Sequence, residues 1–188
     1  MTTNQESTLI KSCLEGDTKA FQQLVEQYKN LVFTLSIKML KNREEAEEVS
    51  QDVFVKIYQS LSKFKGDSKL SSWIYKITYH KCLDVIKKNK KFQADIELND
   101  YNSAHLESID NALQKLITEE RQQMIRQCIN KLPSVDAVLL TMHYFDELTL
   151  EEIADIVKLK TNNVKVKLYR ARQKLATILN EKLQLVVL

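Results

Sequence analysis

The stretch TLEEIADIVKLKTNNVKVKLYRARQKL, residues 149–175, decides the fold of the second half of the chain. Thr149 and Glu152 form a T-x-x-E capping box, in which each side chain can bond a backbone amide at the start of a helix. Apolar residues then recur at helical spacing, and residues 158–160 form a turn. Thr161 is the predicted N-cap of a second helix. The stretch therefore predicts two helices joined by a tight turn.

The second of these helices is basic, because the span from Ile156 to Asn180 holds seven basic residues and no acidic one. A helix-turn-helix lays such a helix in the major groove of DNA. Its cations would bind phosphates, and side chains near its start would reach base edges. The alternative is a solvated basic helix in an ordinary helical domain, since the pattern alone gives false positives. The basic residues are Lys158, Lys160, Lys165, Lys167, Arg170, Arg172 and Lys174.

Composition predicts an all-α fold of two small helical domains joined by an acidic linker. The 188 residues include only two glycines and one proline, so few residues break helices. Gly16 and Gly66 stand alone, which excludes a P-loop and a dinucleotide fingerprint. The net charge of +3 says less than its distribution along the chain. We place the domains at residues 1–92 and 119–188, with the acidic linker at 93–118.

Several function classes are not expected. The cysteines, Cys13, Cys82 and Cys128, form no C-x-x-C pair, so buried free thiols in a reducing cytoplasm are expected rather than a zinc site. No apolar segment is long enough for membrane insertion, and the polar start of the chain is no signal peptide. The three histidines and the scattered carboxylates show no catalytic or metal-ligand spacing. We expect no enzyme activity, no cofactor and no metal.

The first half of the chain predicts a short helix at Thr8–Leu14, ended by Gly16, and a second helix capped by Asp17. The next helix, Arg43–Leu61, carries a mixed acidic and apolar outer patch that a basic partner surface could contact. The alternative is a solvated face whose carboxylates favour the helix dipole. The patch consists of Glu48, Gln51, Asp52 and Val55.

A loop with aromatic and basic residues follows at Lys63–Ser71. Bases stack on aromatic rings while lysines bind phosphates, so the loop fits single-strand binding. The alternative, favoured for Trp73, is that Phe64 and Trp73 pack at the loop ends. The helix from Ser72 to about Lys91 continues a second basic surface, because the span from 54 to 91 holds ten lysines against two aspartates.

The acidic stretch after this helix is read as a linker, either a solvated hinge or a tether that lies in a basic channel of a partner. Helices are predicted again at Glu119–Leu132 and from Pro133, which would occupy the first turn of its helix.

Both halves resemble the ECF (extracytoplasmic-function) sigma factors. The second half resembles their C-terminal DNA-binding domain, and the first half their promoter-melting domain. Two signatures in the right order are more specific than either alone. The residues that carry the resemblance are Leu132-Pro133, Tyr144-Phe145, Leu148-Thr149, Glu151 to Ala154, Val164 to Arg172 and Lys174-Leu175 in the second half, and Glu45 to Val49, Gln51 to Phe54, Phe64 to Ser68, Trp73 to Ile77, Cys82 and Asp84 in the first.

The resemblance implies a binding function, in which the chain carries core RNA polymerase to promoter DNA and helps to open the duplex. An anti-sigma factor is a further candidate partner, and the place of action would be the cytoplasm. The outer patch of Arg43–Leu61 would contact the polymerase. The implied −35 residues are Thr161, Asn162, Asn163, Lys165, Val166, Lys167, Tyr169, Arg170 and Arg172. The implied −10 residues are Lys63, Phe64, Lys65, Gly66, Asp67, Ser68, Lys69, Trp73, Lys76 and His80.

The chain departs from the family pattern at a few positions. His80 stands where many relatives carry Asn, while Ala137 and His143 stand where relatives often have Arg. Glu147 and Lys158 each replace a frequent turn glycine. The rival interpretations are a stand-alone helix-turn-helix regulator, an enzyme, and a helical scaffold that uses its charges for solubility.

Overall fold

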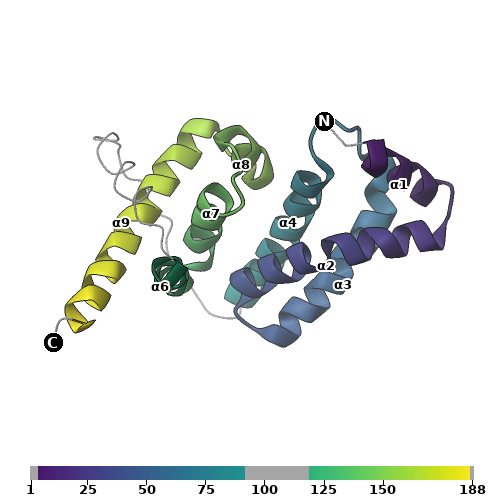
Figure 1. The fold of residues 1–188 in the computed structure, drawn as a ribbon. Helices are drawn as coiled ribbons and strands as arrows, with labels where there is room; N and C mark the ends of the chain where they lie inside the picture. Colours follow the sequence, from purple (N-terminus) through teal and green to yellow (C-terminus); the bar gives the residue numbers. More distant parts are fainter. Residues whose placement is uncertain (1–3, 92–118, 187–188) are drawn as a thin grey trace. The chain divides into compact units, whose positions relative to one another are not determined.

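The computed structural model describes residues 4–91 and 119–186, and within these ranges every regular element is helical (Figure 1). The predicted all-α fold is confirmed, and the described chain falls into two compact units. We call α1 to α4 the N-terminal lobe and α6 to α9 the C-terminal lobe. The predicted linker lies outside the described residues. No helix in the described ranges is long and apolar enough to cross a bilayer.

The N-terminal lobe begins with α1 (Asn4–Leu14) and α2 (Thr18–Leu40). Gly16 adopts a φ of +90° between them, a conformation that costs glycine little. The Asp17 carboxylate then accepts hydrogen bonds from the backbone amides of Lys19 and Ala20, at 2.8 and 3.3 Å. These bonds satisfy amides that have no partner within the helix. The predicted turn and cap are therefore confirmed, although α1 starts four residues earlier than Thr8.

The rest of this lobe consists of α3 (Arg43–Ser60), a 3-10 turn at Leu61–Lys63 and α4 (Leu70–Lys91). The predicted helix to Leu61 thus ends one residue early, and α4 begins two residues before Ser72. α2 packs against both α3 and α4, and α1 packs against α2 (Figure 1). The fully buried side chains of this core include Leu24, Val32, Val53, Ile57, Leu70 and Ile74.

A partly buried polar contact joins α1 to α2. The Tyr28 hydroxyl donates a hydrogen bond to the Glu6 carboxylate over 2.9 Å. Burial and this carboxylate both raise the pKa of Tyr28, so the phenol stays protonated. Cys82 is fully buried at the same lobe's centre, where its thiol lies 3.7 Å from the Ser36 hydroxyl. Burial raises the pKa of Cys82 to about 11, which leaves it a poor nucleophile at neutral pH.

All three cysteines are free and buried, as the sequence predicts. Among the described residues, no group of three or more histidine, cysteine or acidic side chains is arranged to hold a metal ion.

The C-terminal lobe consists of α6 (Glu119–Asn130), α7 (Ser134–Tyr144), α8 (Leu150–Val157) and α9 (Thr161–Val186). The capping box is confirmed: the Glu152 amide bonds the Thr149 hydroxyl at 3.1 Å, and the Thr149 amide bonds the Glu152 carboxylate at 2.9 Å. α7 and α9 form the principal contact of the lobe. Its fully buried residues include Cys128, Val138, Leu140, Met142, Ile153, Val164, Leu168 and Ala171.

Three local predictions in this lobe need correction. Thr161 is the first residue of α9 rather than its N-cap, because the Lys160 carbonyl accepts the Val164 amide at 3.1 Å. Pro133 is likewise the N-cap of α7 rather than a residue of its first turn. The predicted helix at Glu119–Leu132 ends two residues early, because α6 stops at Asn130.

Two turns of the lobe hold non-glycine residues in the left-handed region. Glu147 follows α7 with φ at 53°, and Lys158 follows α8 with φ at 56°. The Glu147 turn is closed by the Leu148 amide, which donates to the Met142 carbonyl at 2.9 Å. A side chain with a Cβ pays a steric cost in this conformation, about 1–2 kcal/mol. The structure thus explains why a glycine would suit both positions.

Glu147→Gly should raise the free energy of unfolding by about 0.5–1 kcal/mol, because the relief of backbone strain exceeds the added entropy of the unfolded chain. Chemical denaturation of the full chain measures the change. Glu147→Ala is the matched control, since it removes the same exposed carboxylate but keeps the Cβ. An equal gain from both variants would show that the charge, and not the backbone, limits stability.

Candidate nucleic-acid interface

The rotation of α9 is fixed by its apolar stripe. Val164, Leu168, Ala171 and Leu175 are buried, with at most 3% of any of them exposed. At about 100° per residue, these positions share one side of the helix and turn the opposite side toward solvent. The residues predicted for −35 recognition that are exposed or half-buried are Thr161, Asn162, Asn163, Lys165, Val166, Lys167, Tyr169 and Arg170.

Arg172 differs from the other predicted −35 residues, because only 8% of it is exposed. Its guanidinium lies over the Tyr144 ring, 5.6 Å from the centroid, within the range of a cation–π contact. The side chain therefore packs α9 onto α7. The sequence could not show this, because the same basic run holds both exposed and buried members and only the ring from α7 separates them.

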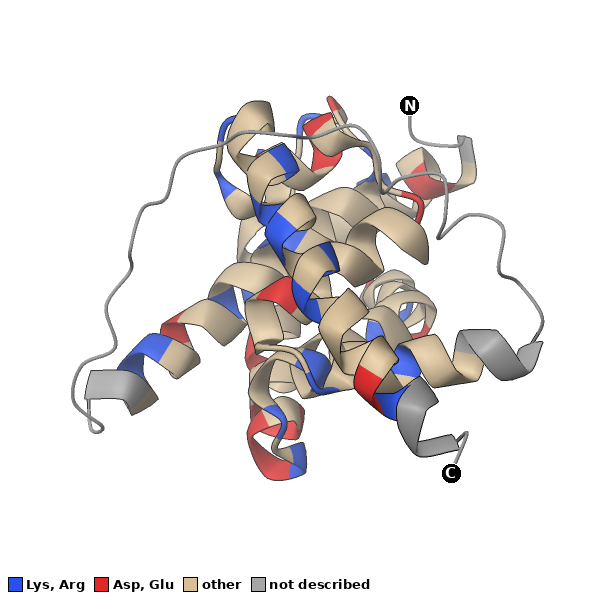
Figure 2. Ribbon diagram, turned by 90° about the vertical axis from the view of Figure 1, so that its left-hand side faces the viewer, with Lys and Arg blue, Asp and Glu red and all other residues tan. Residues whose placement is uncertain are grey.

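Basic residues recur along the exposed length of α9 (Figure 2). Lys174 is exposed and forms an ion pair with Asp136 of α7 at 2.7 Å. Lys165 is exposed near the start of the helix. Lys158 and Lys160 are also exposed, in the turn that leads into α9. The start of the helix thus combines lysine side chains with the side-chain amides of Asn162 and Asn163, which can form hydrogen bonds with base edges.

In the N-terminal lobe, the predicted base-binding loop is a short segment between two buried anchors. Leu61 and Leu70 are 2% and 0% exposed, which fixes both ends of the loop. Gly66 lies between them with φ at 77° and open space around its Cα, so its backbone angle rather than crowding calls for glycine. Of the loop residues, Lys63, Lys65, Asp67 and Lys69 are exposed, and Phe64, Gly66 and Ser68 are half-buried.

The two aromatic rings at this loop face each other. The centroids of Phe64 and Trp73 are 5.3 Å apart and the rings are tilted by 53°. Both side chains are half-buried, so they pack together without disappearing into the core. The structure thus combines the two alternatives drawn from the sequence: the rings anchor the loop and still present aromatic surface. Lys76 and His80 follow on α4, one helical turn apart.

The predicted outer patch of α3 is brought together as expected. Val49, Val53 and Ile57 are buried, so Glu48, Gln51, Asp52 and Val55 share the opposite face. Asp52 forms an ion pair with Lys81 of α4 at 2.9 Å.

Sequence reasoning missed one residue beside this patch. Tyr58 is 59% exposed and stands three residues after Val55, which is 56% exposed. The ring of Phe21 meets the ring of Tyr58 edge to face, with centroids 5.0 Å apart. The i, i+3 spacing of two large apolar side chains outside the core stripe was the available signal.

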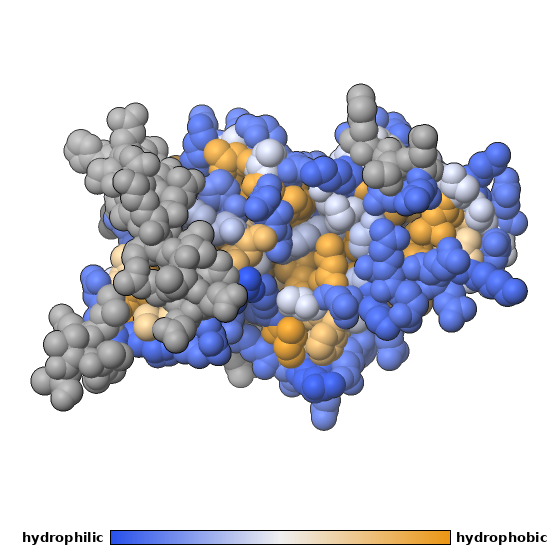
Figure 3. All heavy atoms as spheres, in the orientation of Figure 1, coloured by the Kyte–Doolittle hydropathy of each residue, from blue (hydrophilic) through white to orange (hydrophobic). Residues whose placement is uncertain are grey.

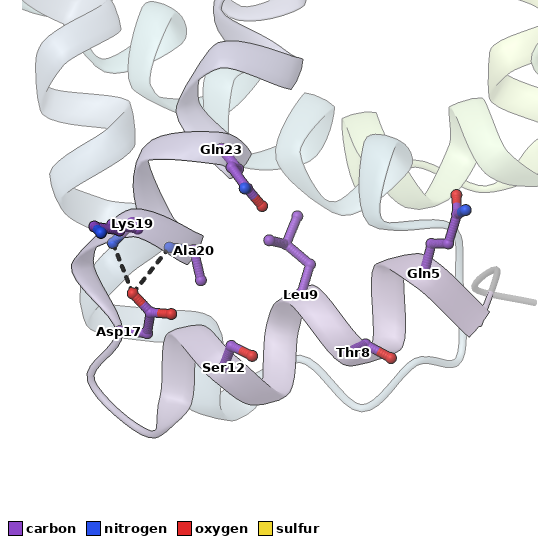
Figure 4. A pocket seen from close by; sticks show the side chains of 8 residues that line it. All are labelled: Gln5, Thr8, Leu9, Ser12, Asp17, Lys19, Ala20 and Gln23. Atoms are coloured by element: carbon purple, nitrogen blue, oxygen red, sulfur yellow. Dashed lines mark hydrogen bonds between the residues drawn. The ribbon is translucent and has the colours of Figure 1, made fainter.

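In Figure 3, hydrophilic residues cover much of the visible surface, and hydrophobic residues gather in patches between them. Two grooves lie within the N-terminal lobe. One, of about 380 Å³, runs between α2 and α3 and includes Phe33, Phe54 and Gln51, so it adjoins the outer patch. The other, of about 570 Å³, lies between α1 and α2, where Leu9 and Gln23 point toward each other (Figure 4).

Comparison with known proteins explains this arrangement. Residues 24–92 match the family model Sigma-70 region 2, and residues 122–175 match Sigma-70, region 4. The chain is 31% identical to the ECF RNA polymerase sigma factor SigW of Bacillus subtilis, over 88% of this chain and 92% of the relative. This chain belongs to the ECF sigma factors. It is also 28% identical to the ECF RNA polymerase sigma-E factor of Escherichia coli, over 89% of this chain and 91% of the relative.

Solved structures show the same fold. The chain resembles CnrH, solved with the cytosolic domain of CnrY, with a TM-score of 0.61 and 19% identity over 93% of this chain and 96% of that one. It also resembles the sigma factor RpoE of Bartonella quintana, solved with the anti-sigma factor NepR. The TM-score is 0.62, and the identity is 19% over 87% of this chain and 98% of that one. In this ECF chain, the region 2 match spans α2 to α4, and the region 4 match runs from α6 into α9.

Proposed function

We propose that this chain carries core RNA polymerase to specific promoters and assists the opening of the duplex. The observation that carries the proposal is that one chain holds both a region 2 and a region 4 match, and that each falls on a separate lobe with its own basic surface. We assign polymerase binding and the −10 element to residues 1–92, and the −35 element to residues 119–188. Residues 93–118 would join the two.

The start of α9 is the proposed reader of the −35 element. Its exposed amides and cations match the two kinds of contact that a recognition helix makes, to base edges and to phosphates. Thr161 to Lys167 would enter the groove first, with Tyr169 and Arg170 one turn later. We leave Arg172 out of the direct contacts because it is buried against Tyr144.

The loop between Leu61 and Leu70 is the proposed site for a base of the opened −10 element. Extruding a base from a duplex costs a few kcal/mol, which stacking and polar contacts can offset. Phe64 and Trp73 offer rings at the loop, and three exposed lysines offer cations for the strand. Lys76 and His80 would lie beside the same element on α4.

The outer patch of α3 is the proposed polymerase-binding surface, through Glu48, Gln51, Asp52 and Val55. Its carboxylates would attract a basic partner surface and fix the docking register. Tyr58 and the groove beside Gln51 extend the patch with apolar area, which supplies binding energy that charges alone do not. In this proposal the chain performs no catalysis, since polymerase carries out nucleotidyl transfer.

The chain would act in the compartment that holds polymerase. A protein of this kind can be held inactive by a partner that covers its binding surfaces, and the RpoE structure of Bartonella quintana contains an anti-sigma factor. We propose an anti-sigma factor as a second protein partner of this chain.

The decisive test is transcription by a holoenzyme reconstituted from the full chain and core polymerase. RNA should start at defined sites on genomic templates, and core polymerase alone should not select them. A stand-alone regulator would instead bind its site tightly without polymerase, which gel shifts with and without core would reveal. Failure to direct any defined start would refute the proposal.

Arg170→Ala should weaken promoter binding by the holoenzyme, because one phosphate contact is lost. The slope of the logarithm of the binding constant against the logarithm of the salt concentration (the salt slope) should become shallower by about one. The free energy of unfolding should stay within about 0.5 kcal/mol, since the side chain is not part of the buried core. Arg172→Ala is the matched contrast. It should cost about 1–2 kcal/mol of stability through lost packing on Tyr144.

At equal folded fraction, Arg172→Ala should leave the salt slope unchanged. The assignment of the two arginines fails if their effects are exchanged.

Glu48→Arg should weaken binding to core polymerase by at least about tenfold, because a like charge would meet the basic partner surface. Co-purification and competition against an unmodified chain measure the effect. The control is Lys81→Ala, which breaks the exposed ion pair with Asp52 at a cost of about 1 kcal/mol or less and leaves the acidic patch in place. Normal binding by Glu48→Arg would move the docking surface elsewhere.

A further inference from the structure

An exposed hydrogen bond on α9 joins two side chains one turn apart. The Gln173 amide nitrogen donates to the Tyr169 hydroxyl oxygen over 2.9 Å. Gln173 is exposed and Tyr169 is half-buried, so the pair lies at the surface of the C-terminal lobe. Gln173 is absent from the set of DNA-binding residues that the sequence predicts, whereas Tyr169 belongs to it.

The pair lies in the middle of the solvent-facing side of α9. Asn162, Val166, Tyr169 and Gln173 follow the spacing i, i+4, i+7 and i+11, which keeps them on one stripe opposite the buried residues. This stripe is uncharged, and Lys165 and Arg170 flank it on opposite sides. Gln173 therefore continues the line of neutral side chains that the recognition helix turns outward.

The direction of the hydrogen bond decides what the tyrosine can offer. A phenol has one proton to donate and an oxygen that accepts. Because the Gln173 amide occupies the accepting oxygen, the hydroxyl proton is left to be donated to another group. The bond also narrows the directions in which the hydroxyl can turn. Tyr169 is thus prepared to donate to an acceptor in front of α9.

We propose that Gln173 is a positioning residue that holds the Tyr169 hydroxyl as a hydrogen-bond donor toward an acceptor of the upstream promoter element. This inference rests on the proposed function of α9. The acceptor is an oxygen of a phosphate or an acceptor atom on a base edge in the major groove, such as a purine N7. Gln173 acts through Tyr169 and need not touch DNA itself.

A purely structural role does not explain the pair. Both residues come from the same helix, so their bond joins no separate elements. Surface pairs at this spacing add only a few tenths of a kcal/mol to a helix. Removal of the bond should therefore leave folding almost unchanged while it alters recognition, which makes the two roles separable by experiment.

The test is a double-mutant cycle on promoter binding by the reconstituted holoenzyme, with Gln173→Met, Tyr169→Phe and the double variant. Each single variant should weaken binding about three- to tenfold, the range expected for one hydrogen bond. The double variant should be no weaker than Tyr169→Phe alone, because Gln173 acts only through the hydroxyl. Thermal midpoints should not change. Gln22→Met, an exposed glutamine on α2, controls for the substitution itself.

Chemically modified promoter templates can identify which DNA group accepts the hydrogen bond from Tyr169. A methylphosphonate at one backbone position removes a phosphate acceptor, and a 7-deazapurine removes a base acceptor. Whichever modification abolishes the difference between the unmodified chain and Tyr169→Phe identifies the group. Additive losses in the cycle, or an unchanged affinity for Gln173→Met, would overturn the inference. Either result would leave the proposed function standing as long as the unmodified holoenzyme still initiates at the promoter.

Discussion

The burial of one apolar stripe on α9 is the constraint on which the C-terminal lobe depends. Val164, Leu168, Ala171 and Leu175 can reach the core together only at one rotation of the helix. A shift of one residue would turn the helix by about 100° and expose them to water, at a cost of about 1.5–3 kcal/mol for each large side chain. Packing therefore selects the face that α9 turns to solvent, which is the face proposed to meet DNA. The proposed reading residues thus stand on a helix whose other side is fixed by the core.

In the N-terminal lobe, buried apolar residues likewise fix which faces of the helices are exposed, and here there are two such faces. The buried stripe of α3 turns an acidic patch outward, while α4 and its preceding loop carry the lysines. On a mixed surface, the electrostatic potentials of opposite charges would cancel. On separate faces each charge keeps its own potential, because salt screens interactions beyond a length of about 10 Å. The Asp52–Lys81 ion pair joins α3 to α4 where the two faces meet, at 2.9 Å. In the proposed function, this single small lobe would attract both a basic protein surface and an acidic DNA strand.

The sequence predicted the elements that local rules control. The cap at Asp17, the capping box at Thr149 and the turn at residues 158–160 depend on residues within a few positions of each other, whereas the turn at Glu147 was implied only by the family resemblance. It failed where a distant side chain decides the outcome. Arg172 resembles its basic neighbours in every local respect, and only Tyr144 of α7 turns it into a packing residue. The pairing of Phe64 with Trp73 and of Gln173 with Tyr169 also required coordinates, because spacing shows that side chains can meet but not which atoms bond.

Modest surfaces suffice for such a protein because its contacts are made jointly. The net charge of +3 divides into +5 on residues 1–92, −4 on residues 93–118 and +2 on residues 119–188, so each lobe has only a weak overall attraction to DNA. Two weak sites joined in one chain bind the same duplex with a gain set by effective concentration, provided that the tether can span them. The 26 residues from 93 to 118 reach at most about 90 Å when extended, so the geometry of the joined partner, rather than the tether, fixes the spacing between the two contacts. In the proposed function, specificity would then belong to the assembly rather than to either lobe alone.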